Sequence, residues 1–470
     1  MTEHLVVIGG DAAGMSAASQ ARRRRGPDEL RITAFEQGDF TSYSACGIPY
    51  WVGGQVPDRD SLIARTPAEH RERGIDLRLR TRVTEIDLDR RRVRSRRTDG
   101  DSGGGTSGDG GSGGPEEWTG FDQLVIATGA EPLRPPLPGF DAPGVHGVQT
   151  LEDGAALLAT LRRDVRRAVV VGGGYIGVEM AEAMIQRGLQ VTVVHRSAEP
   201  MATLDPDMGR LVRVAMEGMG IEVVPGAEAK EVLLNADGRP RAVLTTVGEH
   251  PADVVVLGLG VRPRTALARA AGLALGDSGG LRTDSSMRVE GAEGIWAGGD
   301  CVEVLNLVSG QHQHIALGTH ANKHGLVIGT NIGGGRATFP GVVGTAVSKV
   351  CELEIARTGL REREATAAGL SFDRAVIEAT SRAGYYPGAA PMTVKMIAER
   401  GSGRMLGLQI VGREGAAKRV DIGAVALTAG MTVDQVVSLD LGYAPPFSPV
   451  WDPVQVAARK LVSGRAVSGT

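Results

Sequence analysis

The chain has 470 residues, more than one ordinary hydrophobic core accommodates, so we expect two or three domains. Hydrophobic residues make up 42% of it and charged residues 23%, which excludes a disordered or fibrous protein, and the net charge of -3 gives no reason to expect nucleic acid. No apolar run approaches the roughly 18 residues that a membrane helix needs, and three cysteines are too few for a disulfide framework. We therefore expect a cytoplasmic protein with no membrane or nucleic-acid partner, and we identify no metal site.

The N-terminal segment has the pattern of a nucleotide-binding unit. Strand Leu5–Ile8 leads into a glycine-rich turn, helix Gly14–Arg25 follows, and strand Arg31–Phe35 ends at Glu36. Such alternation predicts a parallel sheet with crossover helices. The turn departs from G-x-G-x-x-G because Asp11 replaces its second glycine, but Glu36 is placed to hold an adenosine ribose. The cofactor contacts expected here are Gly9, Gly10, Ala12, Ala13, Gly14 and Glu36.

A cysteine follows soon after this unit. Gly47 removes bulk beside Cys46, and Pro49 suits the first turn of a helix that begins near the cysteine. At a helix N-terminus the thiolate is stabilised, so we expect a lowered pKa and a nucleophile able to open a disulfide. A small buried core cysteine is the alternative. Cys301 is expected in a packed turn and Cys351 in a strand, both without chemistry.

Signals further along the chain favour FAD in the first unit. Arg78–Arg97 has the pattern of strands on an exposed sheet, and Thr98–Glu117 is so rich in Gly, Ser and Asp that we expect a flexible loop. Strand Gln123–Thr128 then enters a tight turn. Gly294–Asp300 reads as a strand whose terminal Asp could hold the ribityl chain of a flavin. The contacts expected from these segments are Ala127, Thr128, Gly129, Gly299 and Asp300.

A second strand–turn–helix–strand unit repeats the design. Strand Val169–Val171 precedes the turn Gly172–Gly177, a helix runs to Arg187, and strand Gln190–His195 follows. Within the turn, Gly172 permits the tight bend, Gly174 lets the backbone approach a pyrophosphate, and Gly177 lets helix and strand pack closely. The internal duplication predicts two dinucleotide sites.

The end of the following strand bears on the choice of nicotinamide nucleotide. NAD sites place Asp or Glu there, whereas this chain has His195 and Arg196. An acid repels a 2′-phosphate and an arginine attracts it, so we expect NADPH, or use of both NADPH and NADH. Both residues could equally be surface residues.

The sequence pattern changes from about Arg336. Alternating segments Thr393–Ala398 and Met405–Val411 and an Ala-rich helix near Lys418–Ala429 predict a mixed α+β third domain.

The order of these motifs resembles the pyridine nucleotide–disulfide oxidoreductases over nearly the whole chain. The resemblance is strongest to the single-cysteine branch, which contains coenzyme A-disulfide reductases, NADH oxidases and NADH peroxidases. It implies an α/β fold with two Rossmann-like dinucleotide-binding domains, for FAD and NAD(P)H, plus a C-terminal α+β dimerisation domain, and hence a homodimer. We place the FAD-binding domain at 1–150 and 275–335 with a flexible insert at 98–117, the NAD(P)H-binding domain at 151–274 and the dimerisation domain at 336–470. Trp51 stands where two-cysteine relatives have their second cysteine, so an internal redox disulfide is excluded.

Features within the branch favour a disulfide substrate. Oxidases and peroxidases carry a histidine where this chain has Ala12, and coenzyme A-disulfide reductases carry tyrosines at segments that match Tyr386 and Tyr443. Arg22 and Arg23 resemble the stretch that holds the phosphates of coenzyme A, although solvated arginines at a helix end are the competing interpretation. Ala45 departs from the asparagine common in these reductases. The resemblance also implies cofactor contacts at Ser42, which is a substrate contact as well, and at Tyr175, Ile176, Glu179, Gly260, Ala316 and Thr319.

The resulting prediction is an FAD-dependent NAD(P)H:disulfide oxidoreductase. Cys46 would form a mixed disulfide with coenzyme A disulfide or a similar small disulfide, and Tyr386 or Tyr443, from the same or the opposite protomer, would protonate a leaving thiolate. The alternatives are an NAD(P)H oxidase or peroxidase that cycles Cys46 through sulfenic acid, a polysulfide or persulfide reductase, and a low-turnover redox sensor.

Overall fold

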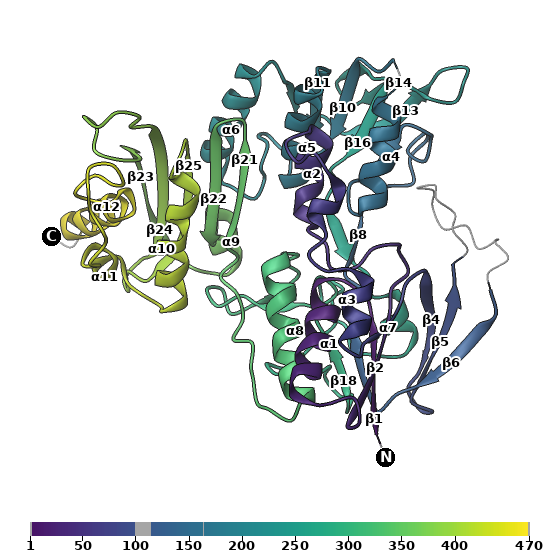
Figure 1. The fold of residues 1–470 in the computed structure, drawn as a ribbon. Coiled ribbons are helices and arrows are strands. Elements are labelled where there is room, and N and C mark those ends of the chain that lie inside the picture. The colour runs from purple at the N-terminus through teal and green to yellow at the C-terminus, as the bar shows by residue number, and fades with distance from the viewer. Residues whose placement is uncertain (1, 99–113, 163, 469–470) are drawn as a thin grey trace.

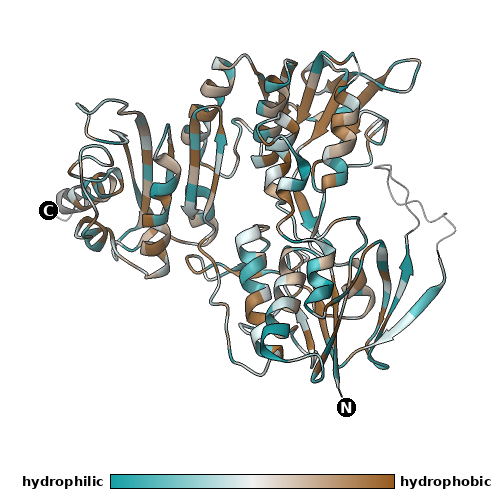
Figure 2. Ribbon diagram, in the orientation of Figure 1, coloured by the Kyte–Doolittle hydropathy of each residue, from teal (hydrophilic) through white to brown (hydrophobic). Residues whose placement is uncertain are grey.

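The first of three large sheets is built from strands far apart in the chain. The computed structural model describes residues 2–98, 114–162 and 164–468. The sheet is parallel, and its strands in spatial order are β18 (Ile295–Ala297), β7 (Gln123–Ile126), β1 (Glu3–Ile8), β2 (Leu30–Phe35) and β3 (Asp76–Arg78). Strands β1, β7 and β18 are mostly apolar (Figure 2) and largely buried, as expected of a parallel sheet covered on both faces.

Two helices pack against each other beside this sheet, α1 (Ala12–Arg24) and α8 (Gly318–Ile332) (Figure 1). Glycines of α8 permit the close approach: a Cβ on Gly325 would lie 2.4 Å from the carbonyl oxygen of Ala13, and one on Gly329 equally close to that of Ala17. The C-terminal segment of the first unit is thereby held against the glycine-rich turn.

The second sheet repeats the parallel arrangement. Its strands in spatial order are β12 (Glu222–Pro225), β11 (Gln190–His195), β10 (Arg167–Val171), β16 (Val254–Leu257) and β9 (Val145–His146). Helix α5 (Tyr175–Gln186) follows β10, and α4 (Leu151–Leu161) precedes it. Both nucleotide-binding units predicted from the glycine turns are therefore present.

Smaller antiparallel sheets and a strand pair complete the two units. They comprise β4 (Thr81–Asp87), β5 (Arg92–Arg97) and β6 (Glu116–Gly120) in one sheet, β13 (Ala229–Leu234), β14 (Pro240–Thr245) and β15 (Gly248–Pro251) in another, and the pair β8 (Ala130–Pro132) and β17 (Val261–Pro263). The predicted flexible insert at 98–117 was too long, because Glu116 and Glu117 already pair with β5. Residues 99–113 of that insert lie outside the described residues.

The third domain is built on an antiparallel sheet. Its strands in order are β21 (Ala346–Val350), β22 (Leu353–Gly359), β25 (Met405–Gly412), β24 (Pro391–Glu399) and β23 (Phe372–Thr380). Helices α10 (Ala416–Thr428), α11 (Val433–Val437) and α12 (Pro453–Ser468) pack with it (Figure 1). Cys351 was expected in a strand but lies in the tight turn between β21 and β22, with φ of 48°.

An ion cluster around the buried Lys395 joins the second unit to the third domain. The ammonium of Lys395, on β24, lies 3.1 Å from Asp205 Oδ2, 2.7 Å from Asp207 Oδ1 and 2.6 Å from Glu362 Oε1. Gln409 also donates to Asp205 at 2.7 Å. Burial alone would lower the pKa of Lys395, but these carboxylates raise it, so the lysine stays charged.

No helix in the described part of the chain combines the length and apolar character needed to cross a bilayer.

Candidate active site

The first glycine turn is packed so tightly that no side chain fits at Gly9 or Gly14. A Cβ on Gly9, whose φ is 108°, would lie 2.1 Å from the carbonyl oxygen of Ala127, and one on Gly14 would lie 1.9 Å from that of Gly9. The backbone of the turn is therefore open to a ligand at the N-terminus of the 13-residue helix α1, where free N–H groups favour a phosphate.

Glu36 lies at the end of β2, next to this turn. Its carboxylate accepts hydrogen bonds from the backbone N–H of Gly10 at 2.8 Å and of Gly38 at 2.7 Å. Burial raises the pKa of Glu36, and the two backbone hydrogen bonds oppose that shift. Each carboxylate oxygen keeps a lone pair for a further donor, which fits the hydroxyls of an adenosine ribose.

Asp11 links the turn to the segment that leads to Cys46. One carboxylate oxygen accepts from the backbone N–H of Tyr43 at 3.3 Å, and the Thr41 hydroxyl donates to the carbonyl of Gly10. Burial, with smaller contributions from Glu36 and Asp300, raises the pKa of Asp11 to about 6. The residue that makes the fingerprint irregular therefore holds the segment that leads to Cys46 against the turn.

The opposite side of the first site is formed by the ends of β7 and β18. The Thr128 hydroxyl donates to the carbonyl of Arg264 at 2.6 Å, and a Cβ on Gly299 would lie 3.0 Å from Ala13 Cβ. Burial raises the pKa of Asp300, while His314, 2.8 Å from the carbonyl of Asp300, lowers it. The N-terminus of α1, the ribose acceptor Glu36 and a second acceptor, Asp300, at the far end of the site together fit FAD.

Cys46 lies in a short 3₁₀ turn, Ala45–Gly47, directly before helix α2 (Ile48–Gly53). The residue is exposed, although surrounding protein partly desolvates its thiol. That desolvation, followed by the charges of Glu179 and Asp300, raises the pKa of the thiol. The predicted lowering was wrong, because α2 has only six residues, begins beyond the cysteine and is opposed by two carboxylates.

The other two thiols differ in position. Cys301 is fully buried, and its Sγ donates to the carbonyls of Ile126 and Gly298, as a packed turn requires. Cys351 is partly buried. Of the three cysteines, Cys46 is the exposed one.

The second glycine turn repeats the steric logic of the first. A Cβ on Gly177 would lie 2.0 Å from the carbonyl oxygen of Gly172, and one on Gly172, whose φ is 115°, would lie 2.2 Å from that of Gly258. Gly174 has no atom within 4 Å of such a Cβ, which leaves space beside the helix N-terminus. The space fits a nucleotide pyrophosphate.

Helix α5 connects this turn to the cysteine. It packs directly on α2, and Glu179 accepts from the Ser348 hydroxyl at 2.8 Å while its charge acts on the Cys46 thiol. Tyr175 lies in the first turn of α5 with its hydroxyl buried, and burial raises its pKa. The sulfur thus lies between groups of the two nucleotide units.

The remaining predicted cofactor residues lie along the edges of these sites. Ile176 is partly buried in the first turn of α5, Gly260 precedes β17 with φ of 92°, and Ala316 and Thr319 flank the start of α8. His195 is buried against the second turn, and Arg196 beside it is exposed.

The arginine cluster at the end of α1 is largely engaged with the protein. Arg22 donates to the carbonyls of Arg25 and Gly74, at 3.1 and 2.9 Å, and Arg25 pairs with Glu3. Arg23 is exposed, and among the described residues its side chain makes one hydrogen bond, from Nε to Gln20 at 2.9 Å. Of the two arginines predicted to bind substrate, Arg23 is the one with its terminal guanidinium nitrogens available.

Ser42 has a partner that the sequence did not reveal. Its hydroxyl lies 3.0 Å from Nε2 of His70, a fully buried histidine on α3 (Pro67–Glu72), and its φ is 50°. Burial, with Arg65 and Arg73, lowers the pKa of His70 to about 4, so the ring is neutral. Asp11, Thr41 and His70 were not among the site residues predicted from the sequence. The irregular glycine turn was a signal for Asp11, but no motif pointed to the other two.

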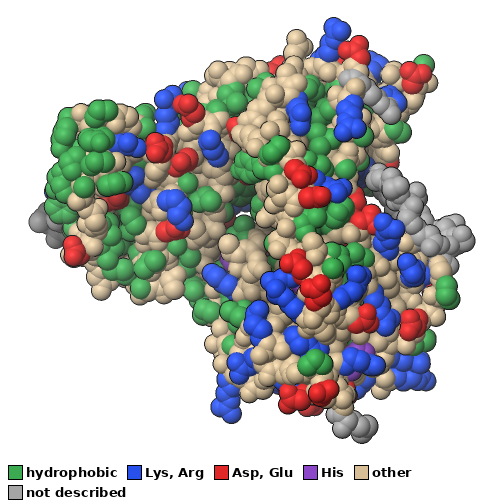
Figure 3. Space-filling model, viewed as in Figure 1, with side chains coloured by type: hydrophobic (Ala, Val, Ile, Leu, Met, Phe, Trp, Pro, Cys, Tyr) green, Lys and Arg blue, Asp and Glu red, His purple; other side chains and the backbone are tan. Residues whose placement is uncertain are grey.

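The two predicted tyrosines are not brought to Cys46 within this chain. Tyr386 and Tyr443 lie in exposed loops of the third domain, which is separate from α2 in Figure 1. Partial desolvation and the neighbouring Tyr385 raise the pKa of Tyr443. Apolar side chains gather on this domain (Figure 3), and the large exposed ones in these loops are Tyr385, Tyr386, Tyr443, Phe447, Val450 and Trp451.

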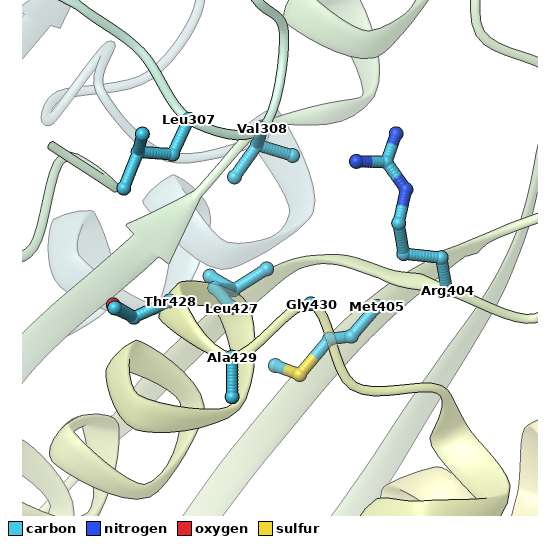
Figure 4. Close-up of a pocket in the computed structure, with 8 residues that line it drawn as sticks. All are labelled: Leu307, Val308, Arg404, Met405, Leu427, Thr428, Ala429 and Gly430. Carbon is cyan, nitrogen blue, oxygen red and sulfur yellow. The ribbon is translucent and has the colours of Figure 1, made fainter. Parts of the chain in front are cut away.

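A cavity of about 280 Å³ lies elsewhere, between the segment at Leu307–Val308 and the end of α10 (Figure 4). Its lining brings Arg404 and Met405 together with Leu427–Gly430. None of the predicted site residues lines it, so it is not the site of the chemistry described above.

Comparison with known proteins supports the arrangement. Residues 3–325 match the family described as pyridine nucleotide-disulphide oxidoreductase, and residues 345–453 match its dimerisation domain. A "NAD(P)H sulfur oxidoreductase (CoA-dependent)" from Pyrococcus furiosus is 37% identical over 97% of this chain and 98% of its own. An NADH oxidase from Methanocaldococcus jannaschii is 34% identical over 96% and 97%. The solved structure of a NAD-dependent persulfide reductase from A. fulgidus has a TM-score of 0.92 at 39% identity, covering 99% of this chain and 84% of that one.

Proposed function

We propose, since the chain belongs to the pyridine nucleotide–disulphide oxidoreductases, that it uses NAD(P)H to reduce the disulfide of coenzyme A or a similar small disulfide through Cys46. The family, the FAD- and NAD(P)H-dependent oxidoreductase chemistry and the three-part fold agree with the prediction from motif order. The substrate and the roles of individual residues are the proposal.

The observation that carries it is the position of the Cys46 sulfur. Cys46 is an exposed residue, and its thiol, although partly desolvated, is close enough to Glu179 of the second unit and Asp300 of the first for both charges to act on it. A sulfur in that position can be reached by a substrate from solvent and by electrons from a flavin held in the first site.

The reaction balances as NAD(P)H, a proton and one disulfide giving NAD(P)⁺ and two thiols. The Cys46 thiolate attacks one sulfur of the substrate, the S–S bond breaks, and the first thiol leaves with a mixed disulfide remaining on Cys46. FAD, when bound, relays the electron pair from the nicotinamide nucleotide. Two electrons then cleave the mixed disulfide, which releases the second thiol and regenerates the Cys46 thiolate. Tyr386 or Tyr443 of a partner protomer would supply the proton to a leaving thiolate.

Arg23 supports a phosphorylated substrate. It is exposed, and its terminal nitrogens form a planar fork suited to phosphate oxygens. Arg22 is held by carbonyls of the chain itself and would contribute mainly to the local fold. We therefore expect Arg23→Ala to raise the KM for coenzyme A disulfide more than the KM for NADPH, and an equal effect on both would return Arg23 to a solvated surface role.

The test of the function is a pair of cysteine variants. Cys46→Ser should keep bound FAD and lose disulfide reduction, whereas the matched control Cys351→Ser should keep both. Flavin content is read from absorbance, and activity from NADPH and NADH consumption with coenzyme A disulfide. Retained turnover in Cys46→Ser would refute the assignment.

A persulfide or polysulfide substrate is a second candidate, favoured by the similarity to the persulfide reductase from A. fulgidus. The same cysteine would attack the terminal S–S bond, so supplying coenzyme A disulfide, polysulfide, peroxide and oxygen separately distinguishes the possibilities. Rapid turnover with oxygen alone would support an oxidase, a name also found among the relatives, and would exclude both proposals. Absence of turnover with every acceptor would support a redox sensor.

The active assembly is proposed to be a homodimer. The match to a dimerisation domain and the exposed aromatic loops around Tyr386 and Tyr443 support it, because such large apolar side chains are seldom left together in solvent. Sedimentation analysis should give twice the 49.0 kDa of the chain, and a monomer at assay concentration would contradict it.

A further inference from the structure

A cavity of about 660 Å³ lies between the C-terminal ends of three helices, away from both glycine turns. It is bounded by α2, α4 and α5, and α2 packs on each of the other two (Figure 1). The volume falls within the range of about 300–1,000 Å³ that is common for small-molecule sites. None of the residues assigned above to FAD, the nicotinamide nucleotide or the substrate lines this cavity.

Most of the cavity wall is apolar. Its larger apolar side chains come from α2 and the segment after it, from α4, and from the residue before β11, and they include Trp51, Val56, Leu158, Leu161 and Leu189. All but Leu189 are only partly buried against the core of the second unit, so apolar surface is left facing the cavity. A ligand with an apolar body would remove that surface from water.

The polar side-chain groups of the lining are all hydrogen-bond donors. They are the guanidinium groups of Arg162 and Arg187 and the indole N–H of Trp51. No Asp, Glu, Asn, Gln, Ser or Thr is among the described residues that line the cavity. The polar part of a ligand must therefore be an acceptor, and the two positive charges favour an anion.

Arg187 is fixed in place at the end of α2. Its Nε donates to the carbonyl of Val52 at 2.6 Å, and its Cζ would lie 3.6 Å from a Cβ built on Gly54. This one hydrogen bond caps the last turn of α2. The two terminal nitrogens have no hydrogen-bond or ion-pair partner in the described part of the chain, and the residue is exposed. A guanidinium held in this way presents a planar fork that matches a carboxylate.

This combination of groups decides the chemical class of the ligand. A nucleotide brings ribose hydroxyls and base N–H groups, whose donors would meet no acceptor side chain in the lining. An ionised carboxylate only accepts hydrogen bonds, and an aliphatic chain needs none. The lining therefore fits an aliphatic chain that ends in a carboxylate.

We propose that this cavity binds an aliphatic carboxylate, with its chain against Leu158 and Leu161 and its head group on Arg187. The site lies at the opposite end of α2 from Cys46, which directly precedes that helix. It is therefore separate from the redox chemistry, and the inference does not depend on the proposed function.

The test uses FAD-loaded protein and titration calorimetry, with decanoate, octanoate and decanol as probes below their aggregation concentrations. Wild type should bind one decanoate per chain, about tenfold more tightly than decanol, because the carboxylate adds charged hydrogen bonds. Octanoate, which is two methylenes shorter, should bind about fifteenfold more weakly than decanoate. Bound decanoate should also change the fluorescence of Trp51, and Trp51→Phe should remove that change.

Two variants with matched controls locate the bound probe. Arg187→Gln should weaken decanoate about tenfold and leave decanol unchanged, whereas Arg210→Gln, at an exposed position of α6 (Pro206–Gly218), should change neither. Leu158→Asp places a negative charge in the cavity and should weaken decanoate by about tenfold or more. Val214→Asp, which adds the same charge at an exposed position of α6, should not. Flavin absorbance shows whether each variant retains its fold.

Equal affinity of the wild type for decanoate and decanol would overturn the proposal, and this comparison requires no variant. That result would indicate a purely apolar occupant, such as a side chain of another protein. Unchanged decanoate affinity in Leu158→Asp would overturn the proposal as well, because the probe would then be bound elsewhere. No disulfide takes part in these measurements, so their outcome is independent of the cysteine variants that test the proposed function.

Discussion

The second glycine turn offers a prediction whose size follows from the structure. In Gly177→Ala the new Cβ would lie 2.0 Å from the carbonyl oxygen of Gly172. Ordinary contact between such atoms is about 3.5 Å, so the N-terminus of α5 must move away from the turn by about 1.5 Å. A displacement of that order costs on the order of a hundredfold in a positioned interaction, and the overpacking itself costs about 1–3 kcal/mol of stability.

The assay is the KM for NADPH together with the FAD content of the purified protein. Gly177→Ala should raise the KM on the order of a hundredfold and keep FAD, because the first turn is untouched. Gly14→Ala is the reciprocal variant: its Cβ would lie 1.9 Å from the carbonyl oxygen of Gly9, and the protein should lose FAD. Gly218→Ala, which meets no atom within 4 Å at the end of α6, controls for substitution itself. A wild-type KM in Gly177→Ala, or loss of FAD from it, would refute the assignment of the two turns.

Two further predictions concern buried charge. Glu179→Gln removes a charge that raises the pKa of Cys46, so alkylation of the thiol at neutral pH, followed by mass spectrometry, should become faster. The control Glu182→Gln should have less effect. Equal alkylation rates in the wild type and both variants would contradict this reasoning. Lys395→Met leaves the carboxylate of Asp205, which is 4% exposed, without its cation. The free energy of unfolding, measured by urea denaturation, should therefore fall by about 3–5 kcal/mol. An unchanged denaturation midpoint would show that the ion cluster does not stabilise the protein.

The substrate side of the site was only partly accessible to sequence reasoning. Arg22 and Arg23 are adjacent and chemically identical, yet one is committed to carbonyls of its own chain and the other is exposed with its terminal nitrogens available. Tyr386 and Tyr443 lie far along the chain in neighbouring exposed loops, linked through the backbone of Ala383 and Pro445. Their approach to a cysteine depends on a partner protomer, which remains a prediction.

The sequence by itself determined the local architecture. Glycines at positions 9, 14, 172 and 177 stand where backbone atoms pack too closely for any side chain, and flanking apolar strands require parallel sheets, so both nucleotide units and the third domain could be predicted from short patterns. Only the tertiary structure decided the electrostatics. The pKa of Cys46 rises, against expectation, because folding partly desolvates the thiol and brings Glu179 and Asp300 to it from distant parts of the chain. Charge and desolvation act through space, and spacing along a chain does not encode them.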